Sequence, residues 1–293
     1  MAQAEAGGRP SIGPGRRVAR LSIAVPSSLV SEVSHPREKT SVIGHVARAA
    51  AIYRVDDIHI YRDRPDESQL IRLVLSYAET PQYLRRRLFS RRPELSYAGV
   101  LPPLRTPHHP LEDHSDRLQK GEYREGVVIS EEEGVFLVEI GVERPLRARG
   151  RAPSIGSRAT VQVEDTSPEL AGRFVGRSEV PQYWGYGVHV ADGSLGSLAQ
   201  RKEFDLTVAT SRNGASFTQV EPQLRARWRE ARNVLVAFGS PRNGVEELLA
   251  RDKLGIQEVF HYSVNTIPDQ GCETVRTEEA IHASLAVLNL LGG

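Results

Sequence analysis

Two loops rich in glycine and small polar residues follow continuous apolar runs near the end of the chain. The first loop, Gly239–Gly244, follows Asn233–Phe238, and the second, residues 265–276, follows Val259–Val264. A continuous apolar run is typical of a buried parallel strand, and each loop precedes a helical pattern. Such loops present free backbone N–H groups at the carboxyl edge of a sheet, where ligands bind. They indicate a nucleotide-like ligand, although neither contains a GxGxxG or P-loop motif; the alternative is a plain strand-to-helix turn.

The sequence of these loops resembles the cofactor loops of the SPOUT RNA methyltransferases. The resemblance is carried by Val236–Gly244 and by Asn265–Gly271 leading into Thr274–Ala280, and it extends to Thr80–Arg85 and Tyr97–Pro110. It covers nearly the whole chain, from residue 20 to residue 291. The most similar branch is the archaeal and eukaryotic group that carries an OB-like domain near the middle and is regarded as ribosomal RNA uridine methyltransferases.

The resemblance implies an α/β fold in which a SPOUT-type C-terminal trefoil-knot methyltransferase domain is interrupted by a small all-β OB-like barrel. Chains rarely thread their own loops, so the residue pattern by itself would argue against a knot. The knot is expected from the resemblance alone. S-adenosylmethionine would lie bent in the knot. The residues that match the cofactor loops of the family, with one arginine from a third loop, are Arg212, Gly239, Ser240, Asn265, Thr266, Ile267, Gly271 and Thr274.

Methyl transfer needs an aligned nucleophile and a way to remove a proton, so cationic and basic side chains are the candidate catalytic residues. Arg105 and His108 lie in a proline-rich segment. An arginine would polarise a uracil carbonyl and favour loss of the ring-nitrogen proton, and His108 would act as base unless it is plain polar surface. Arg276 precedes the final helix, where the alternative is a capping or ion-pair role. Asp269 and Glu273 are further alternatives.

The chain has a single cysteine, Cys272, which excludes a disulfide framework and a zinc cluster of cysteines. Methylation of pyrimidine carbon 5 commonly uses a cysteine nucleophile. The surrounding loop matches no such enzyme, and we predict that Cys272 is a small packed residue.

The composition is that of a cytoplasmic globular protein. The 293 residues are 39% hydrophobic with a net charge of +1, so any RNA site must be a local patch. There is no signal-peptide pattern and no apolar run of membrane-spanning length. We predict neither a membrane nor a metal partner.

The periodicity divides the chain into a disordered arm at 1–16, a discontinuous α/β domain at 17–116 and 191–293, and an inserted barrel at 117–190. Strands at Arg20–Val25 and Asp57–Tyr61 flank a helix at Val42–Tyr53. The barrel is predicted from short period-two strands near residues 126–129, 135–140, 159–163, 173–180 and 186–190. Later elements include a strand at Phe204–Thr210 and helices at Pro222–Arg232 and from an N-cap at Thr277.

Arginines and aromatic residues suggest RNA contact, although arginine runs are usually solvated faces. Arginine binds phosphate and aromatic rings stack on bases. The predicted RNA-binding residues are Arg85, Arg86, Arg87, Arg91, Arg147 and Arg149. The aromatic residues that would stack bases, or else belong to the barrel core, are Tyr183, Trp184 and Tyr186.

These observations predict an S-adenosylmethionine-dependent methyltransferase acting on ring nitrogen 3 of a uridine in large-subunit ribosomal RNA. The alternative is a non-catalytic RNA-binding or ribosome-assembly protein that keeps the fold. A homodimer is expected from the resemblance. The last helix is compatible with it, because Ala283, Ala286, Val287 and Leu290 make the face opposite its core stripe apolar as well.

Overall fold

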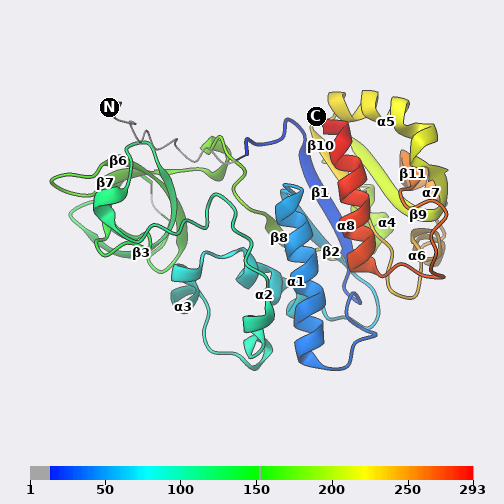
Figure 1. Cartoon of the computed structure of the whole chain (residues 1–293), viewed down its shortest axis with the longest axis horizontal. Helices are drawn as coiled ribbons and strands as arrows, with labels where there is room; N and C mark the ends of the chain where they lie inside the picture. Colours follow the sequence, from blue (N-terminus) through cyan, green and yellow to red (C-terminus); the bar gives the residue numbers. More distant parts are fainter. Residues whose placement is uncertain (1–13, 152, 293) are drawn as a thin grey trace, which may run out of the picture.

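A computed structural model describes residues 14–151 and 153–292, which form an α/β domain and a β-barrel (Figure 1). The α/β domain contains a six-stranded sheet in the order β11-β9-β10-β1-β2-β8, with all neighbouring strands parallel. Its strands are β1 (Arg20–Pro26), β2 (Asp57–Tyr61), β8 (Gly187–Val190), β9 (Leu206–Ser216), β10 (Asn233–Ala237) and β11 (Tyr262–Asn265). The predicted α/β class is therefore confirmed.

Helices cover both faces of this sheet and enclose two apolar cores. One core lies under α1 (Pro36–Ile52), α2 (Ser68–Glu79), α5 (Phe217–Glu230) and α8 (Thr277–Leu288). The other lies under α4 (Leu195–Ala199), α6 (Val245–Arg251) and α7 (Ile256–Val259). Helices α1 and α8 run side by side, and His282 Nε2 lies 3.1 Å from the carbonyl oxygen of His45 (Figure 1). The long parallel strands are buried from both sides, which explains their continuous apolar sequences.

Three helices begin at other residues than predicted. Helix α1 starts at Pro36, where a proline at the first position costs no hydrogen bond and His35 Nδ1 accepts from the Arg37 N–H. Helix α5 starts at Phe217, five residues before the predicted start, and carries Pro222 inside. The N-cap of α8 is Arg276, one residue before Thr277.

The barrel is closed and five-stranded, in the order β3-β4-β5-β7-β6. Only β5 and β7 pair in parallel among its strands, and the other pairs are antiparallel. Its core consists of inward residues such as Val128, Val138 and Val161, as the period-two pattern predicts. The strands are β3 (Tyr123–Glu132), β4 (Val135–Glu139), β5 (Leu146–Arg149), β6 (Arg158–Asp165) and β7 (Ala171–Val175).

The prediction that residues 186–190 belong to the barrel is wrong. This segment is β8, which pairs in parallel with β2 at the edge of the α/β sheet. The predicted strand at 173–180 ends at Val175, and the chain is back in the α/β domain by Tyr183, whose hydroxyl donates to the carbonyl of Val55 at 2.8 Å. A short edge strand alternates like a barrel strand, so periodicity did not separate the two.

Residues 1–13 of the predicted arm lie outside the described residues, and residues 14–16 are attached. Gly15 forms an antiparallel bridge with Gln182, and the Arg16 N–H donates to Pro181 at 3.1 Å. Short helical turns occupy Arg85–Leu88 (α3) and the 3-10 segments Gln82–Leu84, Pro93–Leu95, Ala98–Val100, Ser115–Arg117, Arg177–Glu179 and Asn289–Gly292. Among the described helices none has the length and apolar character needed to cross a membrane.

Candidate functional site

A cavity of about 300 Å³ lies where the last part of β9 and the loops after β10 and β11 meet the start of α8. These strands are neighbours in the sheet, so their carboxyl ends bring three segments that are distant in sequence to one place. Its walls include the apolar side chains of Phe238 and Val264, which are buried under the loops. The cavity therefore combines an apolar interior with polar loop backbone, the usual composition of a small-molecule site.

Side-chain hydrogen bonds connect these three segments to one another. The strand predicted at Phe204–Thr210 continues to Ser216, so Arg212 lies in β9 and the expectation that it comes from a third loop is wrong. Arg212 donates from Nη1 to the carbonyl of Glu273 at 2.9 Å, and Asn265 Nδ2 donates to the Arg212 carbonyl at 3.0 Å. Thr277 on α8 donates to the carbonyl of Gly239 at 3.4 Å. The cavity wall is therefore held by cross-links between loops, in addition to the strands below.

Gly239 is required by a close approach of the loop to itself. A Cβ at this position would lie 2.9 Å from the carbonyl oxygen of Asn243 and 3.1 Å from the Cα of Gly244. The loop is closed by the Ser240 N–H, which donates to the Asn243 carbonyl at 2.8 Å. The glycine thus permits a tight turn at the cavity wall.

The structure brings seven of the eight predicted cofactor-binding residues to this cavity: Arg212, Gly239, Ser240, Asn265, Thr266, Ile267 and Thr274. The eighth, Gly271, is exposed outside the lining, and a Cβ there would meet no described atom within 4 Å. Cys272 is also exposed, so the prediction that it packs inside is wrong. A loop of eleven residues turns part of its length to solvent, and sequence pattern does not say which part.

Several lining residues were missed by the sequence analysis. Ala280 and Ser284 lie one turn apart on α8 and face the cavity, and Ser284 is buried. Small residues at positions i and i+4 of a helix that follows a ligand loop were the available signal. The other missed lining residues include Thr210, Ser211, Asn213, Gln270, Val275 and Thr277.

The charges around the cavity have both signs. Arg212 and Arg242 oppose Glu246, Glu247 and Glu273 in the lining. A ligand that carries both a cationic and an anionic group would therefore find complementary partners. Across residues 14–151 and 153–292, no group of three or more His, Cys, Asp and Glu side chains is arranged to hold a metal ion.

His108 is fully buried away from the cavity, so the structure contradicts its prediction as a substrate base. Its Nδ1 lies 3.1 Å from the Thr106 hydroxyl and its Nε2 lies 2.9 Å from the carbonyl of Glu79. Both ring nitrogens are therefore occupied by the fold. The proline-rich segment packs this histidine against Trp184 of the linker that leaves the barrel.

Arg105 and Arg276 are exposed, as a substrate-contacting residue must be. Arg105 has a positive φ of 52°, a conformation that is uncommon for residues other than glycine. Its position is fixed by Arg48 of α1, whose Nη1 donates to the carbonyl of Leu104 at 2.8 Å. Arg276 lies between two lining residues, at the mouth of the cavity, and its N–H donates to Glu279 at 3.0 Å.

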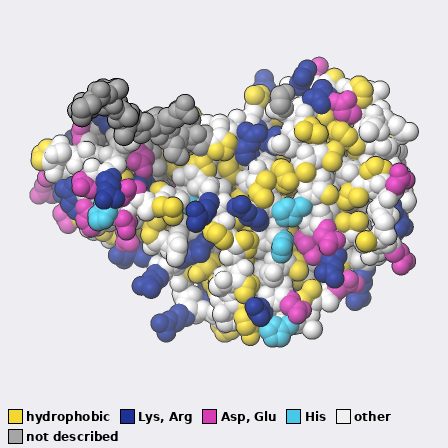
Figure 2. All heavy atoms as spheres, in the orientation of Figure 1, with side chains coloured by type: hydrophobic (Ala, Val, Ile, Leu, Met, Phe, Trp, Pro, Cys, Tyr) yellow, Lys and Arg dark blue, Asp and Glu magenta, His cyan; other side chains and the backbone are white. Residues whose placement is uncertain are grey.

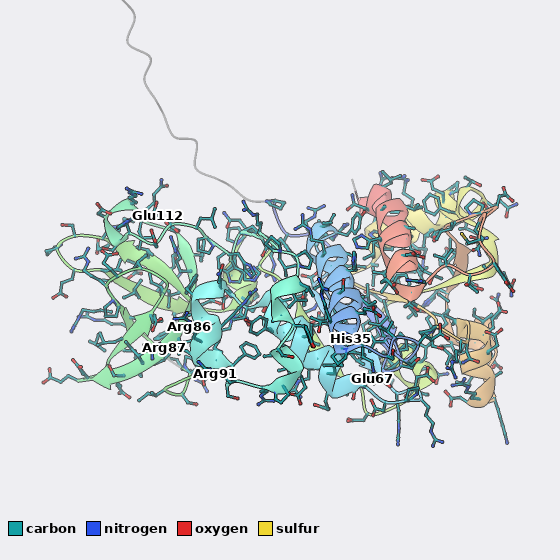
Figure 3. All side chains as sticks on the ribbon, turned by 60° about the horizontal axis from the view of Figure 1, so that its bottom comes forward. His35, Glu67, Arg86, Arg87, Arg91 and Glu112 are labelled. Atoms are coloured by element: carbon teal, nitrogen blue, oxygen red, sulfur yellow. The ribbon has the colours of Figure 1, made fainter. Side chains whose placement is uncertain are left out.

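The predicted RNA-binding arginines have different environments. Arg85 is half-buried, donates to the carbonyls of Thr80 and Ala78, and lies 4.6 Å from the ring centre of Tyr77. It supports the end of α2, so the structure contradicts a primary role in RNA contact. Arg86, Arg87 and Arg91 lie together beside the barrel, with Arg87 ion-paired to Glu139 (Figure 3). On the barrel, Arg147 lies 3.4 Å from Glu169 and Arg149 is exposed.

The three aromatic residues after the barrel are core residues and do not stack on bases. Tyr183, Trp184 and Tyr186 each expose 2% of their surface. The Trp184 indole N–H donates to Glu125 of β3, and the Tyr186 hydroxyl donates to the carbonyl of Leu75 at 3.1 Å. They join the barrel to the α/β domain.

A ligand cavity built from loops at the carboxyl edge of a parallel sheet defines an α/β protein of the ligand-binding or enzyme class. Comparison with known families narrows this class of protein to one family. Residues 20–288 match the family described as "Putative RNA methyltransferase". The chain belongs to this RNA methyltransferase family.

Relatives from distant organisms align along most of the chain. An uncharacterised protein of Halobacterium salinarum is 38% identical over 92% of this chain and 98% of its own length. The human 28S rRNA (uridine-N(3))-methyltransferase is 30% identical over 92% of this chain and 77% of its own. The Drosophila melanogaster protein of the same name is 33% identical, over 92% of this chain and 61% of its own.

Proposed function

We propose that this protein transfers a methyl group from S-adenosylmethionine to ring nitrogen 3 of a uridine in large-subunit ribosomal RNA. The activity is the one for which the human and Drosophila relatives are named. The observation that carries the proposal is the cavity, because Arg212 of β9, Gly239 after β10 and Thr266 after β11 are distant in sequence and line one space. S-adenosylmethionine carries a sulfonium, an ammonium and a carboxylate, which suits a lining with charges of both signs.

Methyl transfer to N3 requires that the protein align the uridine and favour loss of the N3 proton. Neutral uracil must lose that proton before or during attack on the methyl group, and a guanidinium beside a ring carbonyl stabilises the charge that develops. We assign this role to Arg105 or Arg276, both exposed, with Arg276 at the mouth of the cavity. No buried base is required, since water can accept the proton.

A SPOUT-type knot is part of the proposal and is supported by the path of the last segment. After β11 at the sheet edge, the chain contacts Arg212 of β9 through Glu273 and the loop that follows β10 through Thr277. It then forms α8 beside α1. An OB-like identity of the barrel is supported by its five-strand order and by the single parallel pair, β5 with β7.

RNA is proposed to contact the arginines beside and on the barrel. Arg86 and Arg91 are exposed, and no ion pair involves either of them within the described residues. Together with Arg87 they form a local positive patch on a chain of nearly neutral net charge (Figure 3). Arg149 extends the contact to β5 of the barrel.

A homodimer through α1 and α8 is also proposed. Ala286 of α8 is exposed, and Leu290, in the turn that follows α8, exposes 63% of its surface. Ile52, at the end of α1, exposes 47%. Hydrophobic side chains lie over this region beside histidines (Figure 2). The family resemblance implies that a second copy of this chain covers this surface. Light scattering at micromolar concentration tests this, and a stable monomer that methylates RNA would contradict the proposal that the active form is a dimer.

The decisive experiment is mass spectrometry of nucleosides from ribosomal RNA incubated with the protein and methyl-labelled S-adenosylmethionine. Label in 3-methyluridine is expected. Label in another nucleoside would contradict the atom assignment. RNA binding without any label, and without measurable affinity for the cofactor, would support the non-catalytic alternative.

A further inference from the structure

A second hollow, of about 580 Å³, lies on the barrel where β6 begins and β7 ends. We call it the joint groove. Its lining includes Arg151 of the loop between β5 and β6, Arg158 and Thr160 of β6, Phe174 of β7, and Arg177 of the segment that leaves the barrel. The groove therefore adjoins the connection between the barrel and the α/β domain.

A buried ion-pair network fixes one wall of the joint groove. Arg158 donates to Glu79 of α2 and to Glu125 of β3, with both nitrogen–oxygen distances 2.5 Å. Arg177 reaches the same Glu79 carboxylate at 3.3 Å. The carboxylates of Glu79 and Glu125 expose 5% and 2% of their side chains. Burial would raise the pKa of Glu79, but Arg158 and His108 lower it below its usual range, so this wall stays ionised and rigid.

The internal pairing decides which chemical group the groove can accept. Arg158 and Arg177 are matched by Glu79 and Glu125, and the remaining carboxylate of the lining, Glu179, lies 3.4 Å from Arg173. The interior therefore offers no unmatched cation to a bare phosphate. Phe174 is partly buried, with one side in edge contact with Phe136 at 5.7 Å between ring centres. The interior thus offers an aromatic ring and hydrogen-bonding groups, which suit a flat, neutral, polar ligand.

The rim differs from the interior. Arg151 is exposed, and within the described residues no carboxylate lies within ion-pair distance of it. Ile155, in the same loop, exposes 60% of its surface. A cation next to a neutral aromatic slot matches one unit of a single-stranded nucleic acid, with the phosphate at the rim and the base inside.

From this arrangement we infer that the joint groove binds an unpaired nucleotide of the RNA substrate, with its base beside Phe174 and its phosphate on Arg151. The inference rests on the proposed function for the identity of the substrate. The groove is formed by β6 and β7, whereas oligonucleotides on OB-type barrels lie over the second and third strands, here β4 and β5. Its lining includes neither Arg147 nor Arg149.

The position of the joint groove fixes how bound RNA lies relative to the cavity of the α/β domain. Because Arg158 and Arg177 bond to α2, a base held there is at a fixed distance from the α/β domain and its cavity. Binding a nucleotide at this joint would orient the RNA relative to the methyl-transfer site. A site farther out on the barrel would give no such constraint.

The test is fluorescence anisotropy of a labelled ten-nucleotide single-stranded oligouridylate with the full chain. Phe174→Leu, which keeps an apolar contact with Phe136, and Arg151→Ala are each expected to weaken binding at least fivefold, the lower end for loss of one base–aromatic stack. Arg151→Ala should also reduce the slope of log affinity against log salt by about 0.7.

Two control variants separate the groove from general effects. Lys120→Ala removes a cation from the other end of the barrel, where Lys120 lies 3.5 Å from Asp165 and is 76% exposed. Phe136→Leu changes the ring that packs on Phe174 but replaces no residue of the groove lining. Both should bind within twofold of the wild-type chain. Equal losses in all four variants, wild-type affinity in both groove variants, or no binding by the wild-type chain would overturn the inference.

The outcome is independent of the proposed function. If labelled 3-methyluridine is absent from the nucleoside assay but oligouridylate binding depends on Phe174 and Arg151, only the methylation proposal fails. If the wild-type chain methylates RNA and the groove variants keep both affinity and KM for RNA, only the groove assignment fails.

Discussion

The hydroxyl oxygens of Thr266 and Ser284 lie 2.7 Å apart, and this contact ties the loop after β11 to the middle of α8. Both residues line the cavity, and Ser284 exposes 1% of its surface. The next residue of the loop, Ile267, is held by its own N–H, which donates to Asn265 Oδ1 at 2.9 Å. The conformation of the loop thus depends on a helical residue eighteen positions further along the chain.

Replacing Ser284 with alanine should weaken S-adenosylmethionine binding about fivefold. The change removes one hydrogen bond, worth about 1 kcal/mol, and leaves the Thr266 hydroxyl without its partner on α8. Isothermal titration calorimetry measures the effect. Ala283→Ser on the same helix, outside the lining, should bind as the wild type does; unchanged affinity in Ser284→Ala would show that the loop is held by other contacts.

The two loop glycines should respond differently to the same substitution. Gly239→Ala places a Cβ 2.9 Å from a backbone oxygen of its own loop, so the cavity wall must shift, and we expect cofactor affinity to fall about tenfold, or about 1.4 kcal/mol. Gly271→Ala meets no described atom within 4 Å and should bind normally. Calorimetry on both variants provides the comparison, and equal affinities would place the cofactor elsewhere.

Neighbouring arginines of the segment after α2 should separate stability from RNA binding. Arg85→Ala loses two hydrogen bonds to backbone carbonyls and should lower the free energy of unfolding by about 1–2 kcal/mol, as measured by urea denaturation. Arg86→Ala should leave stability unchanged and reduce the salt slope of RNA binding by about 0.7–0.9. A destabilised Arg86→Ala, or an unchanged salt slope, would contradict this division.

Much of the fold could be predicted from sequence because its signals are local. The continuous apolar runs of β1 and β10 identify buried parallel strands, and the alternation of Ala159, Val161 and Val163 identifies the barrel strand β6. The four-residue strand β8 could not be assigned, because its sheet is decided by pairing with β2, which is more than a hundred residues away.

The candidate site shows the same limit. Loop position placed Gly239 and Thr266 at the cavity, since the carboxyl ends of neighbouring strands must converge. The roles of His108 and Arg85 depend on burial against Glu79 and Tyr77, which are tertiary contacts that a residue type does not reveal. The residue types of His108 and Arg85 suggest roles in catalysis and RNA binding, but in the structure both side chains stabilise the fold.

His59 on β2 is a buried histidine whose surroundings oppose its protonation. Its ring stacks on His189 at 5.1 Å between centroids and meets Phe204 edge-on at 5.6 Å. His189 is itself bonded to Asp57 at 2.8 Å, and the same Asp57 accepts from Arg20. Burial, with a further contribution from the charge of His189, lowers the pKa of His59 to about 4.

This lowered pKa predicts a pH-dependent stability. Between pH 6.5 and about 4 the unfolded chain binds a proton at His59 that the folded chain does not, so stability is complete above pH 6.5 and falls as the pH decreases towards 4. The loss is at most about 3 kcal/mol.

His59→Phe, which cannot titrate, should flatten the curve of urea midpoint against pH between 7.5 and 5. Part of the slope should remain, because burial and His108 also lower the pKa of His109 to about 4. The exposed control His114→Gln should keep the full wild-type slope, and an equally steep decline in His59→Phe would show that His59 does not govern the acid stability of the sheet.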